Sequence, residues 1–460
     1  MSKDAIAAVI LAAGQGTRMK SKVPKVLHPI AGRPMLAQLM AAIDALGAEP
    51  GVARRIVVVS PGNGDAIQDA VPGIELAVQD PPLGTGHAAM AAAENLSEFS
   101  GDVLVLFADS PLVSTETLRA MLAARHGASD PAVVVMGFRP ADGAEYARLI
   151  LDDSGNLQRI VEHRDASEAE RGIDLCNSGF MAIDGAILAE LLDGIGNDNA
   201  KGEYYLTEIV EIANRLGRHC AVVEAGEIEA LGVNSRDQLA QAEAVVQNRL
   251  RHAAMAAGAT LLDPDSVYFC HDTVLGQDVS IGPNVFFGPG VRIADDVTVH
   301  AFSHLEGCQV AAGANIGPYA RLRPEAEIGE GARIGNFVEV KKARIEDGAK
   351  VNHLSYIGDA RVGAGANIGA GTITCNYDGF LKSFTDIGKG AFIGSNTALV
   401  APVKVGDGAI VGAGSTITQE VAADALAVER AAQKQQAGWA ASYRKRKAAE
   451  KVAQKKQLKK

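Results

Sequence analysis

Aromatic residues, cysteines and long apolar runs are scarce in this 460-residue chain, and each scarcity excludes some classes of protein. Aromatic residues make up 5% of the sequence while glycine occurs 50 times, a balance that fits a solenoid joined to an α/β domain. The five cysteines are odd in number, scattered and without metal-ligand spacing, which indicates reduced thiols in a cytoplasmic protein. No apolar run approaches the roughly 20 residues of a membrane span. The apolar run at 5–13 lacks a cleavage pattern, so we expect no signal peptide.

Charge is unevenly spread along the chain. The net charge is −11, yet residues 444–460 hold nine Lys/Arg against one Glu, which leaves −19 for residues 1–443. Such a tail is either a solvated, disordered end or a segment that attracts polyanions. An acidic body with one basic tail argues against a dedicated nucleic-acid binder, so we expect no nucleic-acid partner.

The most extensive repeat in the sequence is an aliphatic residue about every six positions from Leu275 to Ile417. Glycine often follows it, as in Ile281-Gly282. A period of six fits neither a helix at 3.6 nor a single strand at 2. It fits a coil of three short strands that each send one aliphatic side chain inward, and so predicts a parallel β-helix. About eight coils, on the order of 40 Å in length, are expected. An ordinary β-sandwich with regular turns is the alternative.

The first half of the chain alternates short apolar runs with helical segments, which predicts an α/β, doubly wound, mostly parallel sheet of Rossmann-like type. The apolar runs lie at 5–11, 55–60, 102–107 and 132–137. Ligands bind at the carboxyl ends of the strands in such sheets. Three polar or glycine-rich clusters lie near such ends, at 11–18, 79–87 and 107–111.

The loop Gly14-Gln15-Gly16-Thr17-Arg18 places backbone N–H groups where phosphates can bind. It matches neither a dinucleotide fingerprint, because Met19 stands where a third glycine is needed, nor a P-loop. Asp109 follows another apolar run and is either a ligand for nucleotide-bound Mg²⁺ or a turn cap. Gly84-Thr85-Gly86 could equally be a plain strand-to-helix turn.

Further motifs occur at 24–25, 83–87, 162–163, 177–179, 202–205 and 232–234. Read as Pro-Lys, Leu-Gly-Thr-Gly-His, Glu-His, Asn-x-Gly, Gly-Glu-Tyr-Tyr and Gly-Val-Asn, they resemble the sugar-phosphate nucleotidyltransferases. With the repeat, nearly the whole chain resembles the bacterial bifunctional N-acetylglucosamine-1-phosphate uridylyltransferase/glucosamine-1-phosphate acetyltransferase family. The resemblance implies a uridylyltransferase domain at 1–234, a linker helix at 235–258, and a left-handed β-helix (hexapeptide repeat) acetyltransferase domain with a basic tail at 259–460. Ser235 and Gln238 predict a capping box for that helix, and Gly258 its end.

The resemblance also implies the residues of a UTP and sugar-phosphate site. Uracil and ribose would contact Leu11, Ala12, Ala13, Gly14, Gln79, Gly84 and Thr85. The phosphates would face Arg18 and Lys25, Mg²⁺ would be held by Asp109 and Asn234, and the amino sugar would contact Glu162, Asn177 and the Ala147 segment. Ala108 and Ala147 stand where the family has glycine, so an added methyl could shift a sugar contact. His87 and His163 are expected to be structural, because this transfer needs no base.

The β-helix carries polar corner residues that a purely structural solenoid would not need, and its repeat is interrupted at 374–379. His353 is the candidate general base, because an imidazole titrates near neutral pH. The resemblance implies that glucosamine-1-phosphate is bound by Arg323, Lys341, Tyr356, Asn367 and Tyr377. It implies that acetyl-CoA is bound by Ala370, Asn376, Ser395, Ala413 and Arg430. Such sites lie between solenoids, so a homotrimer is implied, and residues 418–460 are expected to leave the prism.

Three rival interpretations remain. A metal-dependent hydratase would need converging imidazoles, but His300 and His304 are four apart and should lie on different faces. A nucleotidyltransferase whose β-helix only oligomerises or regulates is the stronger rival. A scaffold with degenerate sites, suggested by Ala108 and Ala147, is the third.

Overall fold

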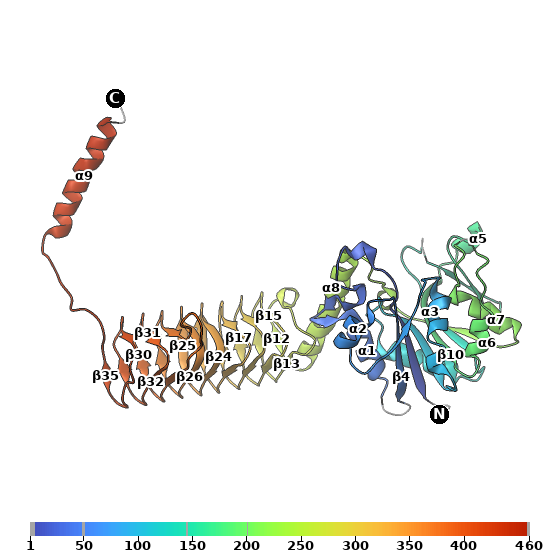
Figure 1. Ribbon diagram of the computed structural model, residues 1–460, viewed down its shortest axis with the longest axis horizontal. Helices are drawn as coiled ribbons and strands as arrows, with labels where there is room; N and C mark the ends of the chain where they lie inside the picture. The colour runs from blue at the N-terminus through green and yellow to red at the C-terminus, as the bar shows by residue number, and fades with distance from the viewer. Residues whose placement is uncertain (1–4, 48–50, 144–145, 200, 458–460) are drawn as a thin grey trace. The chain divides into compact units, whose positions relative to one another are not determined.

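The computed structural model describes residues 5–47, 51–143, 146–199 and 201–457, and the chain divides into two units. The N-terminal unit contains the chain up to Gly258 together with Asp263–Thr273 and Phe287–Gly290. The C-terminal unit contains Ala259–Leu262, Val274–Phe286 and the chain from Val291 onward. Each unit has its own architecture (Figure 1).

The N-terminal unit is built on a mostly parallel sheet with the strand order β11-β7-β10-β6-β1-β4-β5. The strands on this path are β1 (Ile6–Leu11), β4 (Val52–Val59), β5 (Glu75–Val78), β6 (Asp102–Phe107), β7 (Val133–Phe138), β10 (Cys176–Asp184) and β11 (Cys220–Glu224). Only β10 runs antiparallel to its two neighbours on this path. β8 (Arg148–Leu151) and β9 (Leu157–Val161) add an antiparallel extension, and β2 (Pro29–Ile30) pairs with β3 (Arg33–Pro34). The four predicted apolar runs are β1, β4, β6 and β7, and the predicted α/β sheet is confirmed.

Helices cover both faces of this sheet, because alternate residues of a strand point to opposite sides. In β1, Ala7 and Val9 pack into one core, whereas Ala8 and Ile10 pack into the other. The first core is covered by α3 (Thr85–Ala91), α6 (Leu188–Asp193) and α7 (Ile209–Arg215), and the second by α1 (Met35–Asp44), α2 (Gly64–Ala70) and α4 (Thr115–Arg125). The short α5 spans Glu168–Arg171. Burial on both faces explains why these strands are continuously apolar.

The predicted helix after the sheet is α8 (Arg236–Ala256), and Gly258 follows it in the left-handed region. The Ser235 side chain caps it by accepting a hydrogen bond from the Gln238 backbone N–H at 3.3 Å. The second half of the predicted capping box, a bond from the Ser235 backbone N–H to the Gln238 side chain, is wrong. The Gln238 side chain accepts from the backbone N–H of Asn234 instead. That bond ties the start of α8 to the preceding Gly-Val-Asn motif.

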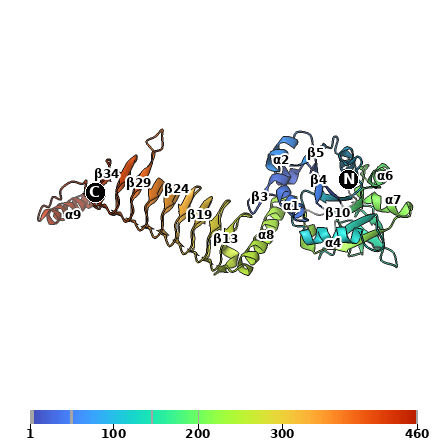
Figure 2. The same ribbon diagram turned by 90° about the horizontal axis from the view of Figure 1, so that it is seen from below.

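The C-terminal unit is a parallel β-helix, as the six-residue repeat predicted (Figure 2). One face is a ten-stranded sheet of β12 (Thr260–Leu261), β14 (Ser280–Ile281), β17 (Thr298–Val299), β20 (Asn315–Ile316), β23 (Arg333–Asn336), β25 (Lys350–His353), β27 (Asn367–Ile368), β30 (Phe392–Ile393), β33 (Ile410–Val411) and β35 (Leu426–Ala427). In its register Val299 pairs with Ile316, Ile316 with Ile334 and Ile334 with Val351, and these side chains are buried. The inward aliphatics therefore form one continuous column.

The other two faces belong to a second sheet, because β24 (Glu339–Ile345) and β26 (Tyr356–Val362) bend from one face onto the next. One of these faces contains β13 (Val274–Leu275), β16 (Arg292–Ile293), β19 (Cys308–Val310), β22 (Ala326–Ile328), β29 (Thr385–Ile387) and β32 (Val403–Val405). The remaining one, which we call the third face, contains β15 (Phe286–Phe287), β18 (His304–Leu305), β21 (Arg321–Leu322), β28 (Ile373–Cys375), β31 (Ala398–Val400) and β34 (Thr416–Ile417).

The prism extends further than expected. Residues 418–427 were predicted to lie outside it, but Val421 bridges to Val405 and β35 pairs with β33 as one more rung. The prediction missed this rung because the regular repeat ends at Ile417 and Val421 follows after only four residues. Beyond it, α9 (Trp439–Gln457) carries the basic residues on a helix that is exposed throughout the part described. None of the described helices is both long enough and apolar enough to cross a membrane.

Candidate active sites

A pocket of about 390 Å³ lies in the N-terminal unit where the carboxyl ends of β1 and β6 meet. Ten predicted residues line it: Leu11, Ala12, Ala13, Gly14, Lys25, Gln79, Gly84, Thr85, Asp109 and Glu162. The sheet brings them together because parallel neighbours end at the same edge. This pocket is the candidate nucleotide site.

Asp109 and Asn234 both direct a side-chain oxygen at the Lys25 ammonium. The distances from Lys25 Nζ are 2.5 Å to Asp109 Oδ2 and 2.9 Å to Asn234 Oδ1. The backbone N–H of Val233 donates to the Asp109 carbonyl at 2.7 Å, which holds the Gly-Val-Asn motif beside the end of β6. Oxygen atoms of a carboxylate and an amide are ligands that suit Mg²⁺, and here they converge on one cationic group.

Two glycines shape the pocket wall. Gly16 has φ +60°, and a methyl group there would lie 2.7 Å from Lys25 Cβ. Gly84 has φ +107°, and a methyl group there would lie 2.6 Å from the Tyr204 carbonyl oxygen. Its own carbonyl accepts a hydrogen bond from Gln79 Nε2 at 2.9 Å, which orients the Gln79 side chain. Both positions therefore require glycine for a left-handed backbone and for close approach.

The pocket also contains a cation, Lys201, that the motifs did not predict. Lys201, Glu203 and Tyr205 line the pocket with Glu162. Burial raises the pKa of Glu162, and the charge of Lys201 opposes that shift. Lys201 directly precedes the Gly-Glu-Tyr-Tyr motif, so its position beside a recognised motif was the available signal.

The remaining four predicted residues lie outside the pocket lining. Arg18 is exposed on a 3₁₀ turn. Asn234 contacts the pocket only through its hydrogen bond with Lys25, which does line it. Asn177 is buried, its backbone N–H donates to the Ala147 carbonyl at 2.9 Å, and its side chain accepts from the Gly179 N–H. The structure thus joins Asn177 to Ala147.

The two alanines that replace glycine have separate surroundings. Ala108 is fully buried in the core on the α1 side of the sheet, so its methyl group packs among apolar side chains. Ala147 is buried in the opposite core, and its carbonyl is the acceptor for Asn177. Neither methyl group lines the nucleotide pocket.

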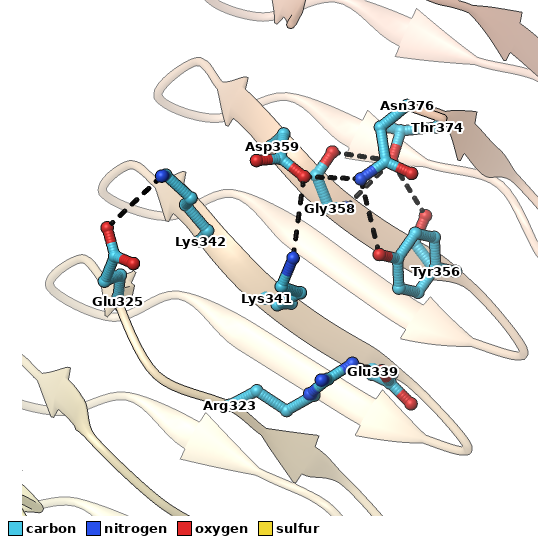
Figure 3. Close-up of polar contacts among 10 residues, drawn as sticks. All are labelled: Arg323, Glu325, Glu339, Lys341, Lys342, Tyr356, Gly358, Asp359, Thr374 and Asn376. Atoms are coloured by element: carbon cyan, nitrogen blue, oxygen red, sulfur yellow. Dashed lines mark hydrogen bonds and ion pairs between the residues drawn. The ribbon is translucent and has the colours of Figure 1, made fainter. Parts of the chain in front are cut away.

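The β-helix gathers predicted substrate residues along one edge, shown in Figure 3. Arg323 Nη1 contacts Glu339 Oε1 at 2.8 Å, and Lys341 Nζ lies 3.9 Å from Asp359 Oδ2. The buried Asn376 donates to the same Asp359 oxygen at 2.5 Å and to the Tyr356 hydroxyl at 3.4 Å. We call this set the cationic edge.

A further lysine reaches the cationic edge from the insertion. Tyr377 and Lys382 form an antiparallel bridge, so the interrupted repeat is a small hairpin. The neighbouring Lys341 ammonium lowers the pKa of Lys382. Two ammonium groups this close favour an anion between them. Sequence reasoning missed Lys382 because only the folded hairpin brings it to Lys341.

Three predicted acetyl-CoA residues share a second edge with His353. The N–H of Gly371 donates to the His353 carbonyl, that of Asn396 to the Ala370 carbonyl, and that of Gly414 to the Ser395 carbonyl. Ala413 occupies the next rung, and the Arg430 guanidinium donates to its carbonyl. Corresponding residues of successive rungs are about 4.8 Å apart, so His353, Ala370, Ser395 and Ala413 form a straight column.

The two edges do not meet within one chain. Among the described residues, no hydrogen bond or ion pair joins the His353 side chain to the cationic edge. His353 ends β25 on the ten-stranded face, whereas Lys341 and Asp359 lie where β24 and β26 bend between the other two faces. Asn367 projects from the ten-stranded face, and Tyr377 is exposed. His300 and His304 lie on different faces, as predicted, with His300 contacting Asn315 and His304 stacked on Phe286.

A nucleotide-type pocket on an α/β sheet, followed by a β-helix with polar edges, defines a two-domain transferase. Residues 8–166 match the MobA-like NTP transferase domain, and residues 272–307, 307–342 and 384–419 match the bacterial transferase hexapeptide repeats.

Three curated relatives extend the match to almost the entire chain, and each is called bifunctional protein GlmU. That of Paramagnetospirillum magneticum is 57% identical over 98% of this chain and 99% of its own length. Those of Rhodospirillum rubrum and Sphingopyxis alaskensis are 60% and 56% identical over 95% and 97% of this chain and 97% and 98% of their own lengths. The chain belongs to the bifunctional GlmU family, and the family and fold class predicted from sequence are confirmed.

Proposed function

We propose that this enzyme makes UDP-N-acetylglucosamine in two steps. The acetyltransferase, at 259–460, acetylates glucosamine-1-phosphate with acetyl-CoA. The uridylyltransferase, at 1–234 and joined by the helix at 235–258, then transfers UMP from UTP to the N-acetylglucosamine-1-phosphate and releases pyrophosphate. The observation that carries the proposal is the presence of two separate polar sites, one on each unit, in a chain that matches a GlmU protein over 98% of its length.

In the first domain, positioning and charge neutralisation are sufficient for uridylyl transfer. The sugar-phosphate oxygen attacks the α-phosphorus of UTP, the bond to the β-phosphate breaks, and pyrophosphate leaves. Lys25 lines the pocket and would present its cation to the phosphates, and Gln79, which donates to the Gly84 carbonyl, would contact the base. A magnesium ion held by Asp109 and Asn234 would neutralise the charge that develops on the leaving group.

In the second domain, the reaction needs a base and an anion site. The phosphate of glucosamine-1-phosphate fits the cationic edge, where Arg323, Lys341 and Lys382 gather. His353 takes one proton from the ammonium, and the amine attacks the thioester carbon. The new C–N bond forms as the C–S bond breaks, and the second amine proton neutralises the CoA thiolate. Proton transfer of this kind contributes about 10²–10⁴ in rate.

A homotrimer through the β-helix would complete this site. The base and the cationic edge lie on two edges of one prism, so a neighbouring copy must supply one of them. A stack of exposed aromatics supports such an interface: Phe302, Tyr319 and Phe337 lie 4.9 and 5.1 Å apart between ring centroids. All three have positive φ, as do other corner residues of the β-helix such as Asp296 and Leu354, so the stack follows one corner of successive rungs.

A reduced, cytoplasmic location suits this function. All five cysteines are free, and four of them are buried. Free thiols of this kind persist where the environment is reducing.

The test follows CoA and pyrophosphate separately with glucosamine-1-phosphate, acetyl-CoA, UTP and Mg²⁺. We expect Asp109→Ala to abolish pyrophosphate release and to leave CoA release intact. His353→Ala should abolish CoA release and leave pyrophosphate release from preformed N-acetylglucosamine-1-phosphate intact.

Two outcomes would contradict the proposal. Pyrophosphate release by a wild type that never releases CoA would favour a nucleotidyltransferase whose β-helix only oligomerises. Equal loss of both activities in His353→Ala would make His353 structural.

A further inference from the structure

The His353 side chain has one polar partner among the described residues. Its Nδ1 lies 2.8 Å from Oδ1 of Asn336, and the imidazole is otherwise exposed. The two residues are register partners on adjacent rungs, in β23 and β25. The backbone N–H of Leu354 also donates to the Asn336 carbonyl at 3.0 Å, so both backbone and side chain tie Asn336 to the His353 corner.

This contact has a definite chemical consequence. A carboxamide oxygen can only accept a hydrogen bond, so Nδ1 must carry the proton. The lone pair of the neutral ring then lies on Nε2, which faces away from Asn336. The tautomer and the ring orientation of a catalytic histidine are set in this way by the hydrogen bond that its other nitrogen makes.

We propose that Asn336 is a positioning residue for acetyl transfer, which fixes His353 in the tautomer whose Nε2 accepts the proton of the substrate ammonium. The inference rests on the proposed function. When Nε2 takes that proton the imidazole becomes a cation, and its Nδ1–H bond to Asn336 becomes charge-assisted and stronger. Asn336 therefore stabilises the protonated base without touching either substrate.

A neutral acceptor suits this base better than a carboxylate. An aspartate at this position would hold the imidazole in its protonated form to higher pH and so remove base from the reaction near neutrality. Asparagine orients the ring without adding a negative charge beside it. This difference gives the inference a readout that a merely structural role of Asn336 would not produce.

The experiment measures CoA release against pH for the full chain and for two variants, Asn336→Leu and Asn336→Asp. Leucine keeps the size and removes the acceptor, so we expect kcat to fall about 10–100-fold while both KM values stay within about threefold. Aspartate keeps the acceptor and adds charge, so the acidic limb of the pH profile should move up by about one unit, with the rate recovered at high pH.

A matched control exists on the same face of the prism. Asn315 makes an equivalent contact with His300, at 3.0 Å from Nε2 to Oδ1. Asn315→Leu removes an asparagine–histidine bond of the same kind, and we expect CoA release to be unchanged. Pyrophosphate release reports only on the N-terminal unit, so thermal unfolding of every variant, followed by far-ultraviolet circular dichroism, reports that the β-helix is folded.

The outcomes separate this inference from the function on which it rests. CoA release that depends on His353 but keeps both kcat and its acidic limb in the two Asn336 variants would overturn the inference alone. A His353→Ala enzyme with undiminished CoA release would overturn the base assignment and the inference together. Loss of the β-helix unfolding transition in Asn336→Leu would show misfolding, and Asn336→Asp would then decide through its pH profile.

Discussion

At the scale of single residues, the nucleotide pocket depends on backbone shape as much as on charge. Gly16→Ala would place a methyl group 2.7 Å from Lys25 Cβ and strain a backbone with φ +60°. The left-handed conformation alone costs about 1–2 kcal/mol, and the contact displaces Lys25. We expect pyrophosphate release to fall at least about tenfold, with CoA release unchanged.

Gly155 provides the control for this prediction. It has φ +84°, but a methyl group there meets nothing within 4 Å. Gly155→Ala therefore carries the backbone strain without the contact to Lys25. If both variants lose pyrophosphate release equally, instability and not the position of Lys25 is the cause.

Glu162, one of the pocket-lining residues, should make the stability of the N-terminal unit depend on pH. Burial raises its pKa, so the folded chain binds its proton more tightly than the unfolded chain does. Stability from this group is therefore present below the unfolded pKa and is lost as pH rises through the raised folded pKa. Glu162→Gln cannot ionise, so its Tm should exceed that of the wild type at about pH 8 by a few degrees, and the excess should shrink toward about pH 5.

Differential scanning calorimetry checks this expectation without substrate. Glu168→Gln, at an exposed position of α5, should show no such pH-dependent excess. A Glu162→Gln excess that grows as pH falls would contradict the direction of the pKa shift.

At the scale of elements, the sequence predicted the strands that belong to a regular repeat. It did not predict the strand pairings that depend on contacts between residues far apart in the chain. The six-residue period fixes the inward position of each rung locally, so the β-helix could be predicted from Ile281, Val299 and their successors. No comparable period marks β10, whose antiparallel place between β6 and β7 is set by tertiary pairing. The contact of Asn336 with His353 was not predicted for the same reason. Asn336 meets His353 only because adjacent rungs are 17 residues apart in sequence.

The insertion hairpin is the element whose function can be tested by shortening it. Asp378 Oδ1 accepts from the N–H groups of Phe380 and Leu381 at 2.8 and 2.7 Å, and the Tyr377 hydroxyl donates to the Gly379 carbonyl. Replacing residues 377–382 by Asn-Gly should remove Tyr377 and Lys382 while the rungs before and after continue, because the Ser383 N–H already donates to the Asn376 carbonyl at 2.9 Å. We expect KM for glucosamine-1-phosphate to rise at least about tenfold, because part of the anion site is lost.

Steady-state CoA release measures this change. Asp378→Asn keeps the side-chain acceptor of the turn, so its KM should stay near that of the wild type. A shortened hairpin with normal KM would remove Lys382 from the sugar-phosphate site.

At the scale of the whole molecule, we expect loss of the assembly to abolish acetyl transfer, because the proposed site needs two copies of the chain. The stacked aromatics Phe302, Tyr319 and Phe337 are 49%, 46% and 56% exposed in one chain. Together with the neighbouring exposed Leu354 they form an apolar strip beside the third face, where a groove of about 430 Å³ is lined by Tyr319, Phe337 and Tyr356. Exposed apolar strips of this kind mark association surfaces.

Phe337→Asp would place a charge in the middle of that strip, and a buried unpaired carboxylate opposes association by several kcal/mol. We expect light scattering to show a loss of trimer at micromolar concentration, and CoA release to fall in proportion and to recover as protein concentration rises. Pyrophosphate release should persist, because the nucleotide pocket is complete within one N-terminal unit.

Val274→Asp adds the same charge at an exposed apolar residue on another face and should change neither mass nor activity. If Phe337→Asp became monomeric with full CoA release, one chain would contain the whole acetyl-transfer site, and the separation of its base from its cationic edge would need another explanation.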